Sequence, residues 1–278
     1  MKIRKILNNS AVITRDSNNK EIIVMGKGIA YNKKNGDSID QDKVYKTFSA
    51  DSQTIHSRII EMIDEIPVKY IDLSEQIINI AKEKLETPLN DSIYISLTDH
   101  IYTSIQRYHE GIPLKNKLQW EIKHFYQKEF EIGQEAVMLI KNETGISMLE
   151  DEAGFIAVHI VSAELDGEVH NSYQITNFIQ QITHIVKYYF SIEFDVESLA
   201  YHRFVTHLKF FGHRIFLQNN KKENPLDNDL LEIIKEKYVQ PYLCSLKIKE
   251  YVEQKYDYIL DNDELLYLTI HIAKIIKQ

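Results

Sequence analysis

Four histidines stand at matching points of two similar stretches of the chain, and their residue type suits reversible chemistry. They are His100, His159, His207 and His271. An imidazole with an ordinary pKa of about 6.5 is mostly neutral near neutral pH, so its free nitrogen is a competent nucleophile. Phosphorylation of that nitrogen would add about two negative charges. At an apolar boundary between helices, this charge could part or clamp the packed surfaces and so act as a switch.

Two other interpretations of these histidines remain open. A histidine on an apolar helix face is most often a hydrogen-bonded part of the core, and duplication copies core residues as readily as reactive ones. A zinc site needs cysteine or carboxylate ligands at close spacing, which these histidines lack, and His202 and His207 are five residues apart, off a common helix face. We therefore expect no metal and no cofactor.

The elements that must position the histidines are helices. Apolar residues recur every three or four positions around His100 and His207, and again around His159 and His271, so each histidine lies at the edge of an apolar face. The clearest helical stripe in the chain consists of Ile175, Phe178, Ile179, Ile182, Ile185, Val186 and Tyr189.

The histidine-bearing stretches form an internal repeat with a period of about 110 residues. Residues 89–107 match residues 196–214, and residues 152–160 match residues 264–272, with an offset that is five residues larger in the second case. One loop that is longer in the second copy, near residues 219–228, accounts for the difference. Repeats of this length are duplicated domains.

The chain before the repeat is predicted to be all β. Its strands lie around turn signals at Asn8-Asn9 and Asn35-Gly36, while Gly26 and Gly28 indicate a bulge, a bend or a close approach of another backbone. The predicted strands are Lys2–Leu7, Ser10–Arg15, Glu21–Met25 and Lys43–Phe48. So small a sheet buries little core alone, and we expect it to dimerise.

The predicted fold class is therefore multidomain. A small all-β domain at the front consists of an antiparallel sheet that dimerises, and two duplicated all-α helical bundles follow it. We place the boundaries of the three domains at residues 1–55, 65–170 and 171–278. Residues 1–55 carry ten Lys/Arg against six Asp/Glu, whereas the rest carries 23 against 35. A basic front on an acidic body favours a polyanionic partner at the front domain.

Composition and motifs exclude several classes of protein. One cysteine, Cys244, allows no internal disulfide and no cysteine cluster, which is typical of a reducing cytoplasm. The apolar stretches are interrupted by charges before they reach the roughly 20 residues that span a bilayer. The sequence contains no P-loop, dinucleotide fingerprint, nucleophile elbow or HExxH motif, so we expect no enzyme activity.

Several of these strings resemble one family. MKIRKILNNSAV, VMGKGIAYNKKNGD and KVYKTF resemble the co-antiterminator RNA-binding domain of the BglG/SacY/LicT transcriptional antiterminators. LTDHIY, AVHI, RFVTHLKFF and DELLYLTIHI are similar to the paired phosphotransferase-system regulatory domains of that family. The resemblance covers essentially the whole chain in the same order.

The resemblance implies that the β domain dimerises and binds an imperfect RNA hairpin, which keeps an overlapping terminator from forming ahead of sugar-utilisation genes. The pattern looks closest to β-glucoside-responsive members. The RNA-contacting positions carry over to Asn8, Asn9, Ser10, Gly26, Lys27 and Tyr31. Amides and a hydroxyl can read base edges, lysine meets phosphate, and an aromatic ring can stack on a base. Family members often have Asn at position 10 and Phe at position 31.

The resemblance also implies a phosphate donor and a regulatory effect for each of the four histidines. It implies that a sugar-specific phosphotransferase permease phosphorylates His100 and His159 and inactivates the protein, while HPr phosphorylates His207 and His271 and activates it. Asp99 would help to orient its neighbour, His100. Two competing hypotheses are a phosphorylation-regulated DNA-binding transcription factor, which needs a helix-turn-helix at the front, and an enzyme of phosphoryl transfer, which needs a phosphate-cradling loop.

Overall fold

The structure, a computed structural model, describes residues 1–49, 53–165, 169–216 and 228–276. It divides into two compact units, the first formed by Met1–Asn116 and Lys128–Glu164 and the second by Lys117–Gln127 and Leu165–Gln278. None of the helices in the described ranges combines the length and the apolar character that crossing a membrane requires. Most of the predicted loop near residues 219–228 lies outside the described residues.

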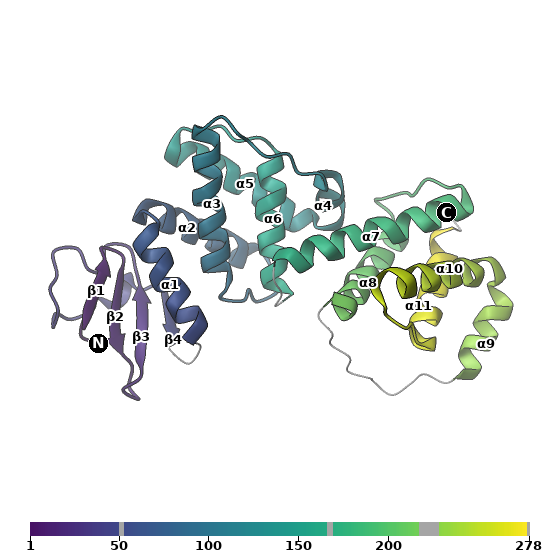
Figure 1. Cartoon of the computed structure of the whole chain (residues 1–278), viewed down its shortest axis with the longest axis horizontal. Helices are drawn as coiled ribbons and strands as arrows, with labels where there is room; N and C mark the ends of the chain where they lie inside the picture. The colour runs from purple at the N-terminus through teal and green to yellow at the C-terminus, as the bar shows by residue number, and fades with distance from the viewer. Residues whose placement is uncertain (50–52, 166–168, 217–227, 277–278) are drawn as a thin grey trace. The chain divides into compact units, whose positions relative to one another are not determined.

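The first unit begins with a four-stranded antiparallel sheet in which neighbours in sequence are neighbours in space (Figure 1). Its strands are β1 (Lys5–Asn8), β2 (Ala11–Arg15), β3 (Glu21–Met25) and β4 (Lys46–Ser49). The predicted antiparallel sheet is confirmed, but β1 and β4 begin three residues later than predicted and β2 begins one residue later. The amide of Ile3 bonds to the carbonyl of Asp37 instead of to a strand, and Gln41–Lys43 forms a 3-10 turn.

The glycine-rich break after β3 is a close approach of two backbone segments, one of the three alternatives that the sequence leaves open. A side chain at Gly26 would collide with the carbonyl oxygen of Lys43, so only glycine fits there. Gly28 has a φ of +65°, in the left-handed region that glycine adopts without strain. The chain then continues through turns, and Ala30 donates its amide to the carbonyl of Asn9, 3.0 Å away. This bond brings the glycine-rich turn beside the β1–β2 turn.

The two central strands, β2 and β3, have a buried residue at nearly every position because both faces of the sheet are covered. Period-two alternation sends Ala11 and Ile13 to one face and Val12 and Thr14 to the other. The first face packs on helices of the same unit, and the second packs on Ile3, Ile29, Ala30 and Ile39 from the flanking turns. The cover that we expected a second sheet to supply is therefore supplied on the first face by the chain's own helices.

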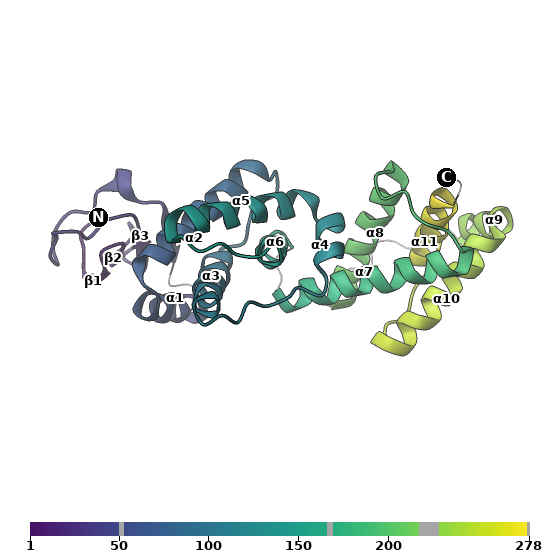
Figure 2. The same ribbon diagram turned by 90° about the horizontal axis from the view of Figure 1, so that it is seen from above.

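Among its described residues, the first unit also contains five helices. They are α1 (Gln53–Glu65), α2 (Val68–Lys84), α3 (Ile93–His109), α5 (Gln127–Thr144) and α6 (Asp151–Glu164). Helix α2 starts directly after Pro67, whose fixed φ suits a helix start, and α3 packs against both α2 and α6 (Figure 2). Helices α5 and α6 cross closely, since a side chain at Gly133 would meet the backbone of Ala153.

The second unit contains six helices among its described residues: α4 (Gln119–Phe125), α7 (Val169–Phe190), α8 (Leu199–Phe216), α9 (Asn228–Lys237), α10 (Val239–Tyr256) and α11 (Asn262–Ile275). The predicted stripe on α7 is confirmed, because Ile175, Phe178 and Ile182 are fully buried. Helix α11 begins with a side-chain cap, in which Asp261 accepts the amide proton of Glu264 at 2.9 Å. The matching segments of the repeat lie on α3 and α8 and on α6 and α11.

Candidate functional sites

The first pair of predicted histidines meets across two helices. His100 on α3 and His159 on α6 have ring centroids 4.7 Å apart, inclined at 39°. Nε2 of His100 lies 2.9 Å from Oε1 of Glu152, a carboxylate at the start of α6 that is only 1% exposed. Only 13% of the His100 side chain is exposed. The predicted pairing of histidines on two helices is thus present, with a buried carboxylate that the sequence analysis did not single out.

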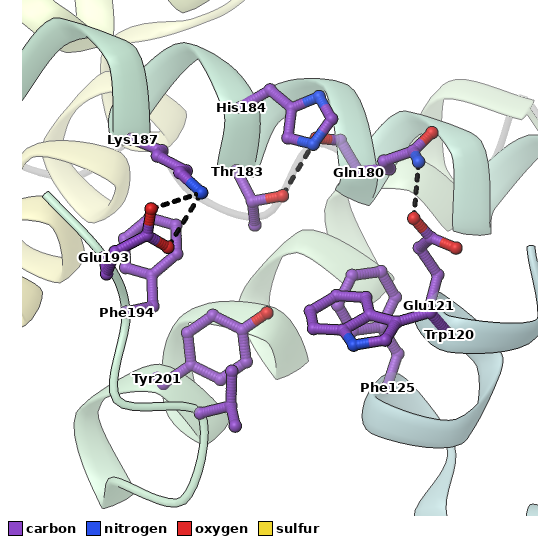
Figure 3. Close-up of a pocket in the computed structure, with 11 residues that line it drawn as sticks. Trp120, Glu121, Phe125, Gln180, Thr183, His184, Lys187, Glu193, Phe194 and Tyr201 are labelled. Atoms are coloured by element: carbon purple, nitrogen blue, oxygen red, sulfur yellow. Dashed lines mark hydrogen bonds and ion pairs between the residues drawn. The ribbon is translucent and has the colours of Figure 1, made fainter. Parts of the chain in front are cut away.

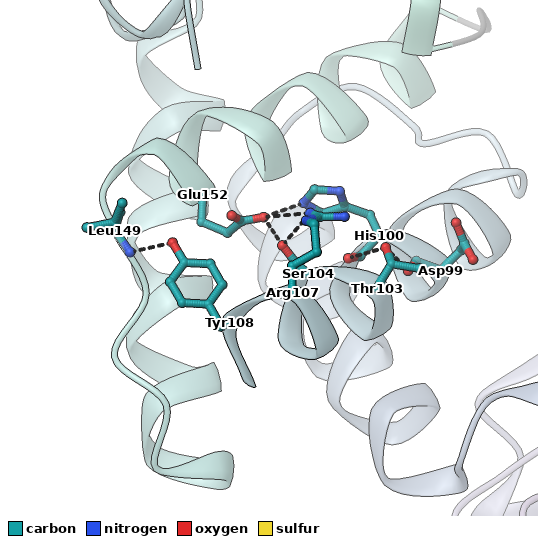
Figure 4. Close-up of polar contacts among 8 residues, drawn as sticks. All are labelled: Asp99, His100, Thr103, Ser104, Arg107, Tyr108, Leu149 and Glu152. Carbon is teal, nitrogen blue, oxygen red and sulfur yellow. Dashed lines mark hydrogen bonds and ion pairs between the residues drawn. The ribbon is translucent and has the colours of Figure 1, made fainter. Parts of the chain in front are cut away.

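Glu152 is the centre of a polar network at the α3–α6 contact (Figure 4). It accepts a hydrogen bond from the hydroxyl of Ser104, which in turn accepts one from Arg107 at 2.9 Å. Nη2 of Arg107 also lies 3.9 Å from the carboxylate. Burial raises the pKa of Glu152, but the bond and charge of His100, with Ser104 and Arg107, outweigh it and hold that pKa below its ordinary value. The carboxylate is therefore ionised at neutral pH.

His159 occupies a less polar position than His100. Burial, and then the proximity of His100, lowers its pKa well below the ordinary value, so the ring is neutral at neutral pH. Its Nδ1 is buried and has no hydrogen-bond partner. The two imidazoles of one pair therefore differ in their surroundings: one faces a carboxylate and the other faces apolar atoms and its partner ring.

The second copy repeats this arrangement. The rings of His207 on α8 and His271 on α11 are stacked, with centroids 4.9 Å apart. Nε2 of His207 lies 3.5 Å from Oε2 of Glu264, and 12% of the His207 side chain is exposed. Arg214 forms an ion pair with the same carboxylate. Burial, followed by the charges of His207 and Arg203, lowers the pKa of His271 to about 4.

One substitution separates the two networks. Position 104 of the first copy is serine, and the matching position 211 of the second is phenylalanine, whose ring lies against His207 with centroids 6.3 Å apart. The hydroxyl of Ser104 links arginine to carboxylate in the first copy, whereas Arg214 bonds to Glu264 directly in the second. Both routes fix the carboxylate beside the histidine.

Asp99 does not take part in the first network. Its side chain is exposed and in Figure 4 its carboxylate points away from His100, while its carbonyl accepts a bond from Thr103 at 2.8 Å. The side-chain placement does not support the orienting role predicted for Asp99, and Glu152 stands in that place instead. Within the described residues, no group of three or more His, Cys, Asp or Glu could hold a metal ion.

The six predicted RNA-contacting residues gather at one end of the sheet. The amide of Ser10 bonds to the side chain of Asn8 at 2.8 Å, and the amide of Gly26 bonds to the carbonyl of Ser10 at 2.9 Å. Asn9, Lys27 and Tyr31 project from the same two turns and are exposed, Tyr31 by 64%. The turns therefore present the amide of Asn9, a cation and an aromatic ring on one small surface, with Asn8 half-buried beside them.

Helix α2 reaches part of this surface. Ser10 is only 2% exposed, and its hydroxyl is hydrogen-bonded to Asp72 of α2, which also lies near the charge of Lys27. Burial raises the pKa of Asp72, although Lys27 and Ser10 act against that rise. Nδ2 of Asn8 and Oδ1 of Asp72 are buried with no hydrogen-bond partner. Helix α2 and a predicted RNA contact thus share one polar junction.

A pocket in the second unit lies between α4, α7 and α8, with Trp120 and Tyr201 on its wall (Figure 3). Its polar groups are paired with one another: Glu121 accepts a bond from Gln180 at 2.5 Å, and Lys187 pairs with Glu193 at 2.7 Å. These pairs hold the pocket walls together.

Known proteins match this architecture. The model of the CAT RNA binding domain matches residues 1–57, and the model of the PRD domain matches residues 75–163 and 180–275. The transcription antiterminator LicT of Bacillus subtilis (strain 168) is 49% identical over 278 residues, all of both chains. The β-glucoside operon antiterminator of Dickeya chrysanthemi is 42% identical over 275 residues, 99% of this chain and 96% of that protein.

A solved structure extends the likeness to three dimensions. The crystal structure of GlcT CAT-PRDI covers 59% of this chain and 97% of its own, with a TM-score of 0.54 and 32% sequence identity. A small RNA-binding sheet followed by a duplicated helical regulatory domain defines an RNA-binding transcription regulator. The chain belongs to the BglG/LicT family of transcriptional antiterminators.

Proposed function

We propose that this protein binds an imperfect RNA hairpin in the leader of sugar-utilisation transcripts, those for β-glucosides, and thereby keeps a terminator from forming. The names of the two relatives at 49% and 42% identity support antitermination, and the name of the second supports the sugar class. The gathered turns support the RNA surface, since Asn9 and Tyr31 are exposed beside the cation of Lys27. Two such surfaces, one from each protomer of a homodimer, would contact one hairpin.

Its activity is controlled in the cytoplasm by phosphorylation of the four paired histidines, and the protein itself catalyses no turnover. A sugar-specific phosphotransferase permease phosphorylates His100 and His159 and thereby inhibits antitermination. HPr phosphorylates His207 and His271 and thereby activates it. The observation that carries this proposal is the close imidazole pair that recurs in both copies, with centroids 4.7 and 4.9 Å apart beside a buried carboxylate.

The pair is a sensitive place for new charge. A phosphoryl group on His100 would stand within a few ångströms of the Glu152 carboxylate. Two like charges about 4 Å apart repel by about 4 kcal/mol at an effective dielectric constant of about 20. This is a large share of the stability of a small domain, so the α3–α6 contact would rearrange.

The test is transcription through the leader with purified full-length protein, polymerase and the phosphotransferase carriers. The double variant H100A/H159A should read through the terminator with the permease present, and H207A/H271A should lose stimulation by HPr. Mass spectrometry at neutral to alkaline pH, which preserves phosphohistidine, should find phosphate on the same residues. HPr-dependent read-through that survives H207A/H271A would refute the activating role. Failure of the full chain to bind the hairpin at low salt, where phosphate contacts are strongest, would remove RNA binding.

A further inference from the structure

The polar junction between helix α2 and the two RNA-contacting turns closes off groups that RNA is proposed to meet. Ser10 is 2% exposed, and its hydroxyl is hydrogen-bonded to the carboxylate of Asp72. The charge of Lys27 acts on the same carboxylate. Asn8, whose Oδ1 accepts the amide proton of Ser10 at 2.8 Å, has its Nδ2 buried. Three of the six predicted RNA contacts therefore lie at this junction, opposite one acidic residue.

We propose that α2 is an autoinhibitory element that Asp72 holds closed over the RNA surface. The carboxylate takes the place of an RNA acceptor on the hydroxyl of Ser10 and offsets the charge of Lys27, so the helix and the hairpin compete for one surface. This inference rests on the proposed RNA binding. It gives Asp72 a role separate from that of the four histidines, and it makes withdrawal of α2 a condition for tight binding of RNA.

A carboxylate is a close chemical substitute for the RNA groups that this surface would meet. Its oxygens are anionic acceptors like those of a phosphate, and they accept from a hydroxyl as a base carbonyl does. The amide of Gly28 points at Oγ of Ser10 at 3.5 Å, so this oxygen is the acceptor there and its one proton is donated to Asp72. The same proton cannot be donated to RNA while α2 is in place.

The closed junction carries costs that make it reversible. Nδ2 of Asn8, Oδ1 of Asp72 and the hydroxyl of Tyr45 are buried and have no hydrogen-bond partner among the described residues. Each such group weakens the closed state by about 5-fold or more. The hydroxyl of Tyr45 also lies in the field of the Asp72 and Glu75 carboxylates. When α2 withdraws, water or RNA can satisfy these groups, so a modest competing affinity is enough to open the junction.

Opening would separate the helices from the sheet without unfolding either part. Helix α2 packs against α3, and Lys82 of α2 donates a hydrogen bond to the hydroxyl of Tyr94 at 2.8 Å, so the two helices move together. The four-stranded sheet keeps its own ladder of backbone pairs. The Asp72 junction is therefore a contact between two preformed parts, which suits a reversible switch.

The first experiment measures binding of the imperfect leader hairpin to the unphosphorylated full-length chain. The variant D72N keeps the shape of the side chain, removes its charge and weakens the bond to Ser10. It should bind the hairpin about 10-fold more tightly, because a hydrogen bond to a charged group is worth about a factor of ten in an equilibrium. The matched control is E83Q, the same change at an exposed glutamate in the last turn of α2, which should alter affinity by less than about 2-fold.

The second experiment follows the junction itself and also works with Asp72 intact. Spin labels on E21C, in β3, and on Q76C, in α2, report the distance between the sheet and the helix. Both positions are exposed, and the native Cys244 is buried. Excess unlabelled protein suppresses distances between protomers. Addition of the hairpin should replace the closed distance by a longer one, and D72N should show the longer distance in part of the molecules before RNA is added.

Equal affinities of the wild type and D72N, or an unchanged distance between the labels when RNA is bound, would overturn the inference and leave the proposed RNA binding intact. A gain in affinity that E83Q shares in full would show general charge repulsion and would also overturn the role of Asp72. Failure of the proposed function has a different form: neither the wild type nor D72N would bind the hairpin, while D72N would still lengthen the distance. That result would keep Asp72 as the contact that holds α2 closed and remove RNA as its competitor.

Discussion

Lys27 offers a quantitative test of the RNA surface. It is exposed on the turn after β3, so its removal should leave the fold intact. Each phosphate that a lysine neutralises contributes about 0.9 to the slope of log affinity against log salt on a duplex. If ion release is the whole contribution, one contact strengthens binding by about 15-fold at 50 mM salt and by about 4-fold at 200 mM. A dimer that contacts RNA through both protomers would double the change in slope.

The assay is RNA-hairpin binding by the full chain and its K27A variant, measured at several salt concentrations between those limits. The matched control is K20A, since Lys20 precedes β3 and lies at the opposite end of the sheet from the two turns. K27A should lower the slope by about one per protomer, and K20A should leave it nearly unchanged. An affinity loss in K27A that is equal at 50 and 200 mM salt would refute phosphate contact, and equal effects of the two variants would refute the location of the surface.

Four further predictions follow from single contacts. Y31A should weaken hairpin binding by about 1–3 kcal/mol, the stacking energy of one base, without changing the midpoint of urea unfolding, whereas Y31F should bind normally. G133A should lower the free energy of unfolding by about 1–3 kcal/mol, because its methyl group meets the backbone of Ala153; an unchanged urea midpoint would contradict this close crossing. E152Q should be about 1.5–3 kcal/mol less stable than the wild type near pH 7. This difference in the free energy of unfolding should shrink as pH falls through the lowered pKa of Glu152. A difference that stays constant down to pH 3 would contradict the charge effect. Because the pKa of His271 is lowered to about 4, this ring takes up a proton more readily in the unfolded chain, and the free energy of unfolding should fall as pH drops below 6.5. In the same urea titrations, the free energy of unfolding of H271N should fall less.

The sequence predicted the order and class of the elements because local signals and tertiary structure agree. The period of apolar residues around His100 and His207 persists in α3 and α8, and alternation through Ala11–Arg15 persists in β2. The edges of the sheet were less predictable. Lys2–Arg4 has strand-like residues, but the backbone amide of Ile3 pairs with the turn at Asp37, a long-range choice that no local pattern records.

Glu152 and Glu264 were the residues that sequence reasoning missed at the candidate site. A glutamate near a helix start is usually solvated, so its residue type gave no reason to bury it. A signal was nevertheless present, since arginine follows the first histidine of each pair by seven positions and glutamate precedes the second by seven. Seven residues are two helical turns, which place both groups on one face.

The assignment of α4 shows a different limit. Residues 117–127 lie within the predicted domain 65–170, yet they form part of the second compact unit. There Ile122 and Phe125 are buried, and Tyr126 receives Lys209 over its ring at 4.2 Å. A seven-residue amphipathic helix does not specify which of two similar bundles it joins, because that choice depends on the shape of the receiving surface.

The sheet face that carries Ala11, Ile13 and Phe48 can serve one neighbour at a time. In this chain it is occupied by the following helices, with Phe48 edge-on to Tyr94 at 5.5 Å and Lys46 paired with Asp91. A tethered neighbour acts at an effective concentration in the millimolar range, whereas a second copy of the protein must arrive by diffusion. Any partner sheet that uses this face therefore competes with the helices already packed on it, and the fraction of paired sheets depends on the concentration of the protein.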